Sequence, residues 1–268
     1  MSIITLTTDF GLKDGFVGTM KGVILGICPD TRLVDLTHTV RPQNILEGAI
    51  ALWRAYAFFP PGTVHLAVVD PGVGTDRNPM AARIGDHFFV GPDNGIFTHI
   101  YEDAERLGGR MELVRLENRQ YWLAQVSRTF HGRDIFAPVA AHLAAGTRLA
   151  DLGPALQDPV RIQPLRPEKT SSGWRAHVTV VDVFGNCTTD LPASAIIHQQ
   201  EAKFLVCGRT IHGLVESYGE KGTGELVALV DSEQYIEIAI VNGNAAHELG
   251  LQVGDIIQVQ ISHPTSQS

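Results

Sequence analysis

Short apolar strand patterns alternate with amphipathic helix patterns over the first half of the chain, and this alternation constrains the fold more than any other feature. Strands are predicted over residues 3–8, 33–36, 63–69 and 87–90, and helices over residues 14–27, 45–56 and 134–145. In the first helix, for example, Phe16, Met20 and Ile24 fall on one face. The order strand, helix, strand predicts an α/β fold in which helices pack on a mostly parallel sheet.

The second half of the chain has a different pattern. A polar, turn-forming stretch from Leu165 to Gly173 separates the two halves. Beyond it, β-like runs with little helical periodicity cover residues 176–181, 203–206, 226–230, 236–241 and 256–261. We therefore expect an N-terminal α/β domain over residues 1–164 and a small C-terminal β-barrel domain over residues 174–262.

Charge and cysteine content exclude several classes of protein. The 268 residues carry a formal net charge of -8 and their basic residues are scattered singly, which argues against a nucleic-acid partner. The N-terminus reads as a strand rather than a signal peptide, and no apolar run is long enough to span a bilayer. The cysteines, Cys28, Cys187 and Cys207, show no CxxC spacing. We expect a soluble protein of the reducing cytoplasm.

Four apolar strands end in an acidic residue beside a glycine turn. These residues are Asp9, Asp70, Asp93 and Asp182. Ligands of open α/β sheets bind beyond the carboxyl ends of the strands, so acidic side chains repeated there would line one crevice. Each residue taken singly is also an ordinary turn former, and only the repetition favours a site.

One histidine, His131, lies just before a predicted helix, where unpaired N–H groups favour negative charge and a hydroxide-like water. Helix capping or loop packing explains the same position. A hard cation held by Asp9, Asp14, Asp70, His131 and Asp134 is a competing interpretation, although metal-ligand spacings such as HxxxH are missing. Phosphate-binding loops are also missing from the sequence.

Six ordered motifs give the chain a family resemblance over nearly its whole length. They are TTDFG at 7–11, VVDPGVGTDR at 68–77, GPDNG at 91–95, FHGRDIFAPVAAHLAAG at 130–146, DVFGN at 182–186 and NGNAA at 242–246. With these motifs the chain resembles the S-adenosylmethionine hydroxide adenosyltransferases, relatives of the fluorinating and chlorinating S-adenosylmethionine enzymes. That family pairs an N-terminal α/β domain with a C-terminal β-barrel.

The resemblance also implies the site. It places the catalytic triad on Asp70, Arg77 and His131, and it implies that Asp9 holds the ribose hydroxyls. Further substrate contacts are implied at Asp182, Phe184, Asn186, Ser232, Asn244 and Ala245. Relatives of this kind are trimers whose pocket lies between the N-terminal domain of one subunit and the C-terminal domain of its neighbour, and S-adenosylmethionine is the substrate, with no cofactor or metal.

The implied reaction is displacement at the ribose 5′ carbon, with neutral methionine leaving, so the nucleophile is the difficult part. We expect Asp70 and His131 to hold a water and take up its proton while Arg77 favours the hydroxide form. A halide about 4 Å from the Asp70 carboxylate would be repelled by roughly 4 kcal/mol at an effective dielectric of about 20, so water should be favoured over halide. Fluorinating relatives carry an uncharged aromatic residue in place of Asp70 and Tyr-Ser in place of His131-Gly132. A binder of adenosine or S-adenosylmethionine without turnover, and a metal-dependent hydrolase, remain as alternatives.

Overall fold

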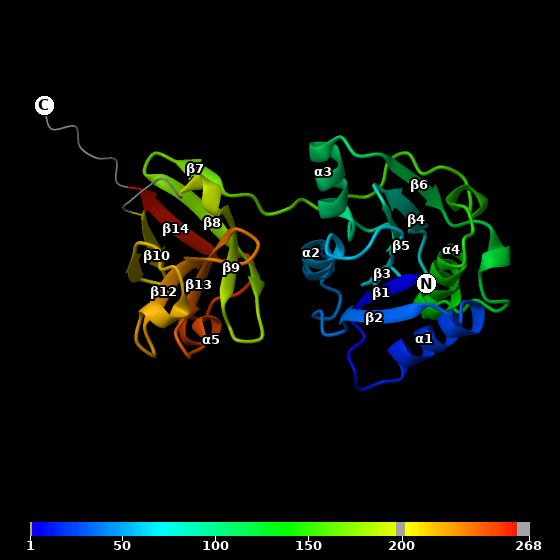
Figure 1. The fold of residues 1–268 in the computed structure, drawn as a ribbon, viewed down its shortest axis with the longest axis horizontal. Helices are drawn as coiled ribbons and strands as arrows, with labels where there is room; N and C mark the ends of the chain where they lie inside the picture. Colours follow the sequence, from blue (N-terminus) through cyan, green and yellow to red (C-terminus); the bar gives the residue numbers. More distant parts are fainter. Residues whose placement is uncertain (1, 197–201, 262–268) are drawn as a thin grey trace, which may run out of the picture. The chain divides into compact units, whose positions relative to one another are not determined.

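The computed structural model describes residues 2–196 and 202–261 and divides into two compact units, Met1–Pro164 and Leu165–Ser268 (Figure 1). The N-terminal unit contains the strands β1 (Ile3–Thr8), β2 (Arg32–Thr37), β3 (Val64–Val68), β4 (Pro79–Ile84), β5 (His87–Pro92) and β6 (Met111–Arg115). Its helices are α1 (Phe16–Ile27), α2 (Ile45–Tyr56), α3 (Thr98–Leu107) and α4 (Ala137–Ala144), with a π-helical turn at Gly132–Phe136 and 3₁₀ turns at Arg119–Tyr121 and Leu149–Asp151.

The N-terminal sheet has the strand order β2-β1-β3-β5-β4-β6. The pairs formed by β2, β1, β3 and β5 are parallel, whereas β4 is antiparallel to both β5 and β6. The predicted α/β fold with a mostly parallel sheet is therefore confirmed. The strands β4 and β6 and the helix α3 are elements that the sequence patterns did not predict.

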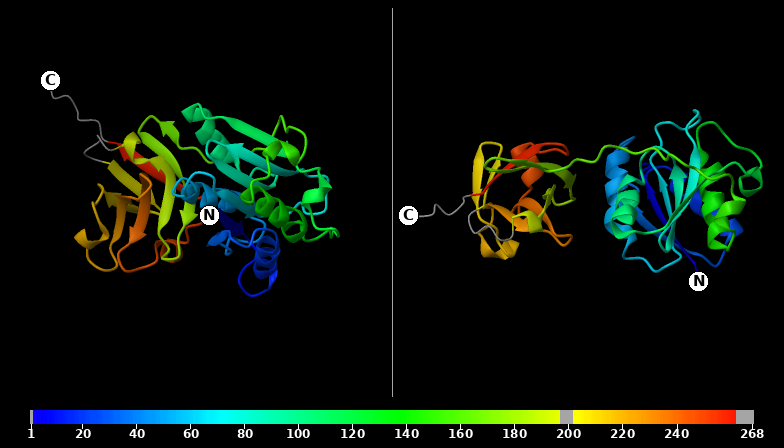
Figure 2. Two further views of the ribbon diagram at one scale, coloured as in Figure 1. Left: turned by 45° about the vertical axis from the view of Figure 1, so that its right-hand side comes forward. Right: turned by 90° about the horizontal axis from the view of Figure 1, so that it is seen from above.

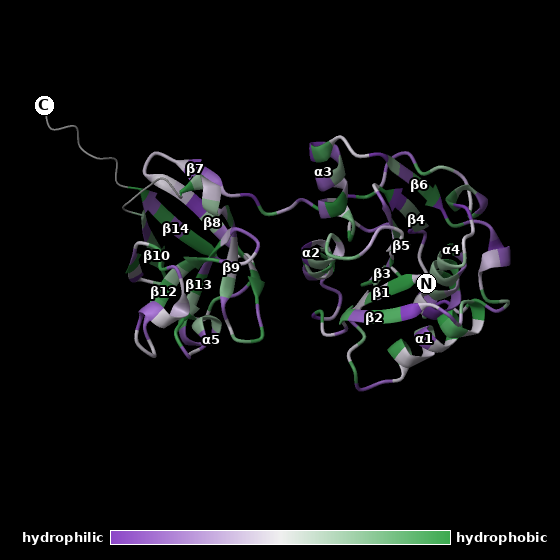
Figure 3. Cartoon of the chain, viewed as in Figure 1, coloured by the Kyte–Doolittle hydropathy of each residue, from purple (hydrophilic) through white to green (hydrophobic). Residues whose placement is uncertain are grey.

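Helices cover both faces of this sheet, as the views in Figure 2 show. Strand β3 illustrates how, because alternate side chains point to opposite faces. Leu66 packs into a core shared with α1 and α4, and Ala67 packs into a core shared with α2 and α3. Figure 3 shows the hydrophobic character of β1, which lies between β2 and β3.

The helix expected at residues 134–145 has a different first turn. A π-helical turn over Gly132–Phe136 precedes α4, and the N–H of Ala137 bonds the carbonyl of Gly132. Pro138, in the first turn of α4, has no N–H to donate to the Asp134 carbonyl, which instead accepts from the N–H of Leu123 at 2.9 Å. Proline thus explains why the regular helix begins three residues later than predicted.

The C-terminal unit is antiparallel and nearly closed into a barrel, as predicted. Its strands are β7 (Glu168–Thr170), β8 (Gly173–Val181), β9 (Cys187–Pro192), β10 (Ala202–Val206), β11 (Arg209–His212), β12 (Leu226–Val230), β13 (Tyr235–Ile240) and β14 (Ile256–Ile261). The strand order is β11-β10-β14-β8-β9-β13-β12, with β7 on the side of β8, and a bridge between Val215 and Leu229 brings the two ends together. The unit also has the short helix α5 (Ala245–Leu249) and 3₁₀ turns at Ala193–Ala195 and Tyr218–Glu220.

Candidate active site

Three side chains from distant parts of the N-terminal unit form one hydrogen-bonded cluster. Asp70 follows the end of β3, Arg77 lies seven residues later, and His131 immediately precedes the π-helical turn. The Nε of Arg77 donates to both carboxylate oxygens of Asp70, at 2.9 and 3.0 Å, and one Nη donates to the same carboxylate. That nitrogen also lies 2.8 Å from Nδ1 of His131. The structure thus brings together the three residues predicted as a triad.

The cluster is enclosed and its charges are paired. The Asp70 side chain is 5% exposed and the Arg77 side chain 9% exposed. The Arg77 guanidinium also lies over the ring of Phe136, 5.1 Å from its centroid. A bidentate guanidinium–carboxylate pair fixes both groups in one plane, so Asp70 is held as an oriented carboxylate.

Hydrogen bonding fixes the protonation state of His131. Arg77 can only donate, so Nδ1 of His131 must accept and carries no proton. Burial and the neighbouring Arg77 guanidinium hold the pKa of His131 below its ordinary value, although Asp70 and Asp134 oppose this shift. His131 is therefore neutral at neutral pH, and its proton is on Nε2.

Two turns are brought together by a close approach at Gly74. This glycine has a φ of +77°, and a Cβ added to it would lie 2.3 Å from the carbonyl oxygen of Arg128. Only glycine allows the turn after Asp70 to contact the segment that leads to His131. The same turn carries Arg77 back toward the Asp70 carboxylate.

The other acidic residues of the N-terminal unit differ in their surroundings. Asp9, after β1, accepts a hydrogen bond from the N–H of Gln43 at 2.8 Å and is partly exposed. Asp93 is 4% exposed and accepts from the N–H of Val160 at 2.8 Å. The prediction that Asp93 lines a crevice is wrong, because its carboxylate anchors a neighbouring segment. Asp14 is exposed ahead of α1.

The candidate substrate residues of the C-terminal unit lie on two loops that contact each other. Asp182 accepts from the N–H groups of Phe184 and Asn186 at 2.9 and 2.8 Å, so its carboxylate shapes its own turn. This arrangement leaves Phe184 71% exposed. The N–H of Ala246 donates to the carbonyl of Gly185, which ties this turn to the start of α5.

The remaining predicted substrate contacts lie at the start of α5 and in the turn between β12 and β13. Asn244 caps α5 by accepting from the N–H of His247 at 2.7 Å, and the following Ala245 is fully buried. Ser232 is exposed in the turn between β12 and β13. In that turn Asp231 accepts from the N–H groups of Glu233 and Tyr235, both at 2.9 Å.

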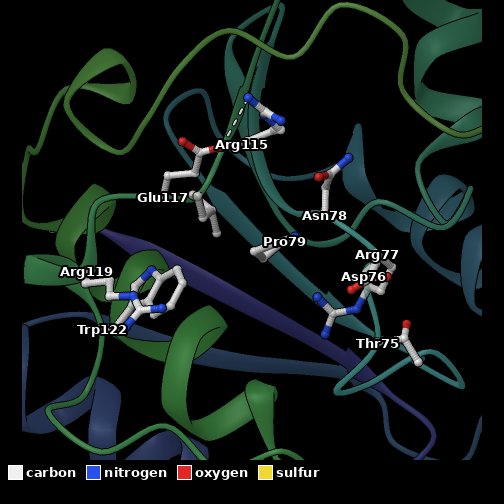
Figure 4. A pocket seen from close by; sticks show the side chains of 10 residues that line it. Thr75, Asp76, Arg77, Asn78, Pro79, Arg115, Glu117, Arg119 and Trp122 are labelled. Atoms are coloured by element: carbon white, nitrogen blue, oxygen red, sulfur yellow. Dashed lines mark ion pairs between the residues drawn. The ribbon is translucent and has the colours of Figure 1, made fainter.

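A hollow of about 290 Å³ adjoins Arg77 within the N-terminal unit (Figure 4). Arg119 lies over the ring of Trp122 on one side of it, and Arg115 pairs with Glu117 at 3.1 Å on another. The hollow has room for several water molecules. Arg77 therefore adjoins a space that can hold water, in addition to bonding Asp70 and His131.

A metal site would need several ligating side chains to converge on one point. Among residues 2–196 and 202–261, no group of three or more His, Cys, Asp or Glu side chains is arranged to hold a metal ion.

Within the described residues, no helix combines the length and the apolar character that crossing a bilayer requires.

Fold and site together define a class of protein: an α/β unit with an aspartate–arginine–histidine cluster at its strand ends, followed by an antiparallel β unit. Residues 4–153 match the SAM hydroxide adenosyltransferase N-terminal domain, and residues 176–258 match the C-terminal domain of the same family. The chain belongs to the SAM hydroxide adenosyltransferase family.

The chain is similar over nearly its full length to several named proteins and to a solved structure. A protein of Salinispora tropica named (R)-S-adenosyl-L-methionine hydrolase is 44% identical over 260 residues, which cover 96% of this chain and 97% of the relative. A fluorinase of Actinoplanes is 30% identical over 292 residues, covering 96% and 97%. The crystal structure of an uncharacterized conserved protein from Thermotoga maritima superposes with a TM-score of 0.89 at 35% identity, covering 97% of this chain and 100% of that one.

Sequence reasoning missed two residues beside the cluster. The backbone N–H and the hydroxyl of Ser127 donate to the fully buried carboxylate of Asp134 at 2.8 and 2.7 Å. Asp134 stands three residues after His131, but it was considered only as a metal ligand. Ser127 has no signal in the sequence, because its importance depends on the path of the loop.

Proposed function

We propose that this protein hydrolyses S-adenosyl-L-methionine to adenosine and L-methionine. The observation that carries the proposal is the enclosed Asp70–Arg77–His131 cluster in a chain whose relatives include proteins named as hydrolases of this substrate. The water oxygen forms a bond to C5′ of the ribose while the C5′–S bond breaks. The electron pair of the C5′–S bond stays on sulfur, so methionine leaves as a neutral thioether, and one proton of the water is released.

Asp70 is the group best placed to receive that proton. Its two oxygens accept from Arg77, but a carboxylate has lone pairs for further donors, and a water hydrogen can take one of them. Arg77 supplies positive potential where hydroxide character develops, in a position fixed before the reaction. The Nδ1 lone pair of His131 is already engaged by Arg77, so His131 acts chiefly through that contact.

Recognition of the substrate is assigned to the other predicted residues. We propose that Asp9 binds the ribose hydroxyls and that the two contacting loops of the C-terminal unit bind the rest of the substrate. These loops carry Asp182, Phe184, Asn186, Asn244 and Ala245, with Ser232 on the β12–β13 turn. The exposed Phe184 ring offers a flat apolar face of the kind on which adenine stacks.

The proposed chemistry needs no cofactor or metal ion, because the leaving group is already a cation and departs as a neutral molecule. The working form is proposed to be a cytoplasmic homotrimer in which neighbouring copies complete the site, without nucleic-acid or membrane partners. Native mass spectrometry with and without adenosine would test the trimer. A monomer with full activity would contradict it.

Isotope labelling tests the reaction directly. The protein is incubated with S-adenosyl-L-methionine in ¹⁸O-labelled water containing EDTA, and the products are identified by mass spectrometry. We expect adenosine and methionine with the label on the 5′ oxygen of adenosine. Because the hydrolase relatives are named for the (R) form, the two sulfonium epimers are assayed separately.

Each alternative has its own outcome in this experiment. Binding of S-adenosylmethionine without any adenosine would support a binding protein. Activity lost in EDTA and restored by a divalent cation would support a metal-dependent hydrolase. A 5′-halogenated nucleoside as the main product at high halide would overturn the choice of water, a test made pertinent by the fluorinase relatives.

A further inference from the structure

A buried carboxylate, that of Asp134, lies three residues after His131 in the chain. The Asp134 side chain is fully buried, and it accepts from Ser127 through the backbone N–H at 2.8 Å and the hydroxyl at 2.7 Å. The Ser127 hydroxyl in turn accepts from the N–H of Phe130 at 3.0 Å. These bonds close the loop from Ser127 to Asp134 around His131.

The closed loop carries His131 and so fixes the backbone from which its ring projects. The ring faces Arg77 with Nδ1, which accepts from the guanidinium at 2.8 Å. The position of this loop therefore decides whether the His131 ring can reach Arg77.

We infer that Asp134 and Ser127 are positioning residues that hold the loop of His131 where Nδ1 can accept from Arg77, and so keep Arg77 oriented on Asp70. This inference rests on the proposed hydrolysis and deepens it. Asp134 and Ser127 close the loop that carries His131, and side-chain hydrogen bonds then run from His131 to Arg77 and from Arg77 to Asp70. If the loop opens, the His131 ring can turn away and Arg77 loses one of its two bonded partners.

The charged groups around His131 set the expected pH response. Arg77 and Asp70 face it from the turn after β3, Asp134 faces it from its own segment, and Arg133 pairs with Asp134 at 2.6 Å. Protonation of His131 would replace the acceptor at Nδ1 by a donor, so activity should fall on the acid side. Asp134 raises the pKa of His131, so neutralising Asp134 should move that acid limb to lower pH.

The test compares Asp134→Asn, Ser127→Ala and Ser127→Thr in the full-length enzyme. We expect kcat to fall about tenfold in Asp134→Asn and Ser127→Ala, with KM within about twofold, because substrate contacts are untouched. Ser127→Thr keeps the hydroxyl and should restore kcat to within about twofold. In Asp134→Asn the acid limb of kcat/KM should also shift to lower pH.

A matched control separates positioning from stability. Asp151→Asn removes a carboxylate that likewise holds an arginine, Arg148, at 3.0 Å, but Asp151 is partly exposed and this arginine is exposed. Melting temperatures are recorded for all four variants. Equal kcat in Asp151→Asn, Asp134→Asn and Ser127→Ala, or an unmoved acid limb with loss in melting temperature alone, would overturn the inference. Wild-type protein that forms no adenosine would instead defeat the proposed function itself.

Discussion

The two units prepare their functional groups in opposite ways. In the N-terminal unit Asp70 and Arg77 are nearly buried and bonded to each other, whereas in the C-terminal unit Val183 and Phe184 are 88% and 71% exposed. The backbone of the loop that carries Val183 and Phe184 is fixed by Asp182, while the two apolar side chains stay exposed. The contrast suggests that the first unit holds chemistry ready and that the second offers surface for the substrate to cover.

Replacing Asp70 should produce the largest separation between chemistry and binding. Asp70→Asn keeps the shape of the side chain but removes its charge and basicity, so we expect kcat to fall by about 10³-fold. The Kd for substrate, measured by calorimetry, should change by less than about threefold. Unchanged turnover, or a loss explained by weaker binding alone, would remove Asp70 from its proposed role.

The close approach at Gly74 should be the next most sensitive feature. Gly74→Ala requires a side chain at a φ of +77° and places its Cβ against the Arg128 carbonyl, so we expect about 3 kcal/mol of destabilisation and a lower kcat. Chemical denaturation and steady-state kinetics measure the two effects.

Gly18→Ala provides the control for Gly74→Ala. Gly18 lies in α1, where an added Cβ meets no atom within 4 Å, so this variant should be stabilised by roughly 0.5–1 kcal/mol. Equal behaviour of the two variants would mean that the turns after Asp70 and before His131 do not depend on their close packing.

Phe184 should give the opposite split from Asp70. Phe184→Ala removes an exposed ring, so stability should stay within about 0.5 kcal/mol, whereas loss of stacking should weaken substrate binding by about 2 kcal/mol. Titration calorimetry and the KM measure this effect. Phe58→Ala, at an 84% exposed site in the N-terminal unit, is the control and should alter neither. A large fall in kcat with unchanged KM would break the proposed division between the units.

How far the sequence predicted this structure depends on whether neighbouring residues determine an element. Alternating or continuous apolar runs located β1, β12 and β14 to within a residue, because such patterns reflect burial on a sheet. Strand β4 begins with Pro79 and follows a glycine-rich turn, and α3 has only a short apolar stripe, so neither was predicted. The nearly closed β unit was predicted as a class, but the strands β7, β9 and β11 were not.

The candidate site was less predictable for a physical reason. Residue spacing alone could place Asp70 after a strand and His131 before a helix, but their meeting depends on Arg77 folding back from a turn that only Gly74 permits. The family motifs named the three residues. The tautomer of His131 follows from its bond with Arg77, and the contribution of Ser127 follows from its bonds with Asp134; neither has a local signature.

The two units should also differ in how much folding stability they lose in mild acid, and this is the smallest of the expected effects. His65 of β3 is fully buried, bonds the hydroxyl of Thr5 at 2.8 Å and lies 3.3 Å from Nδ1 of His87. Burial, with a smaller contribution from His87, lowers the pKa of His65 to about 3. The unfolded chain binds this proton below about pH 6.5 and the folded chain does not, so stability is complete above that pH and is lost as the pH falls.

Between pH 6.5 and 5 the loss contributed by His65 alone should approach about 1.4 kcal/mol per pH unit, measured by urea denaturation. In the C-terminal unit His177 is only partly buried and lies 2.8 Å from the Asp190 carboxylate, so the N-terminal unit should unfold first in acid. His65→Gln should flatten the slope, whereas His212→Gln, at an exposed position on β11, should leave it unchanged. Two outcomes would contradict this prediction: the C-terminal unit unfolds first, or His65→Gln leaves the slope of stability against pH unchanged. In either case buried His65 is not the cause of acid sensitivity in the N-terminal unit.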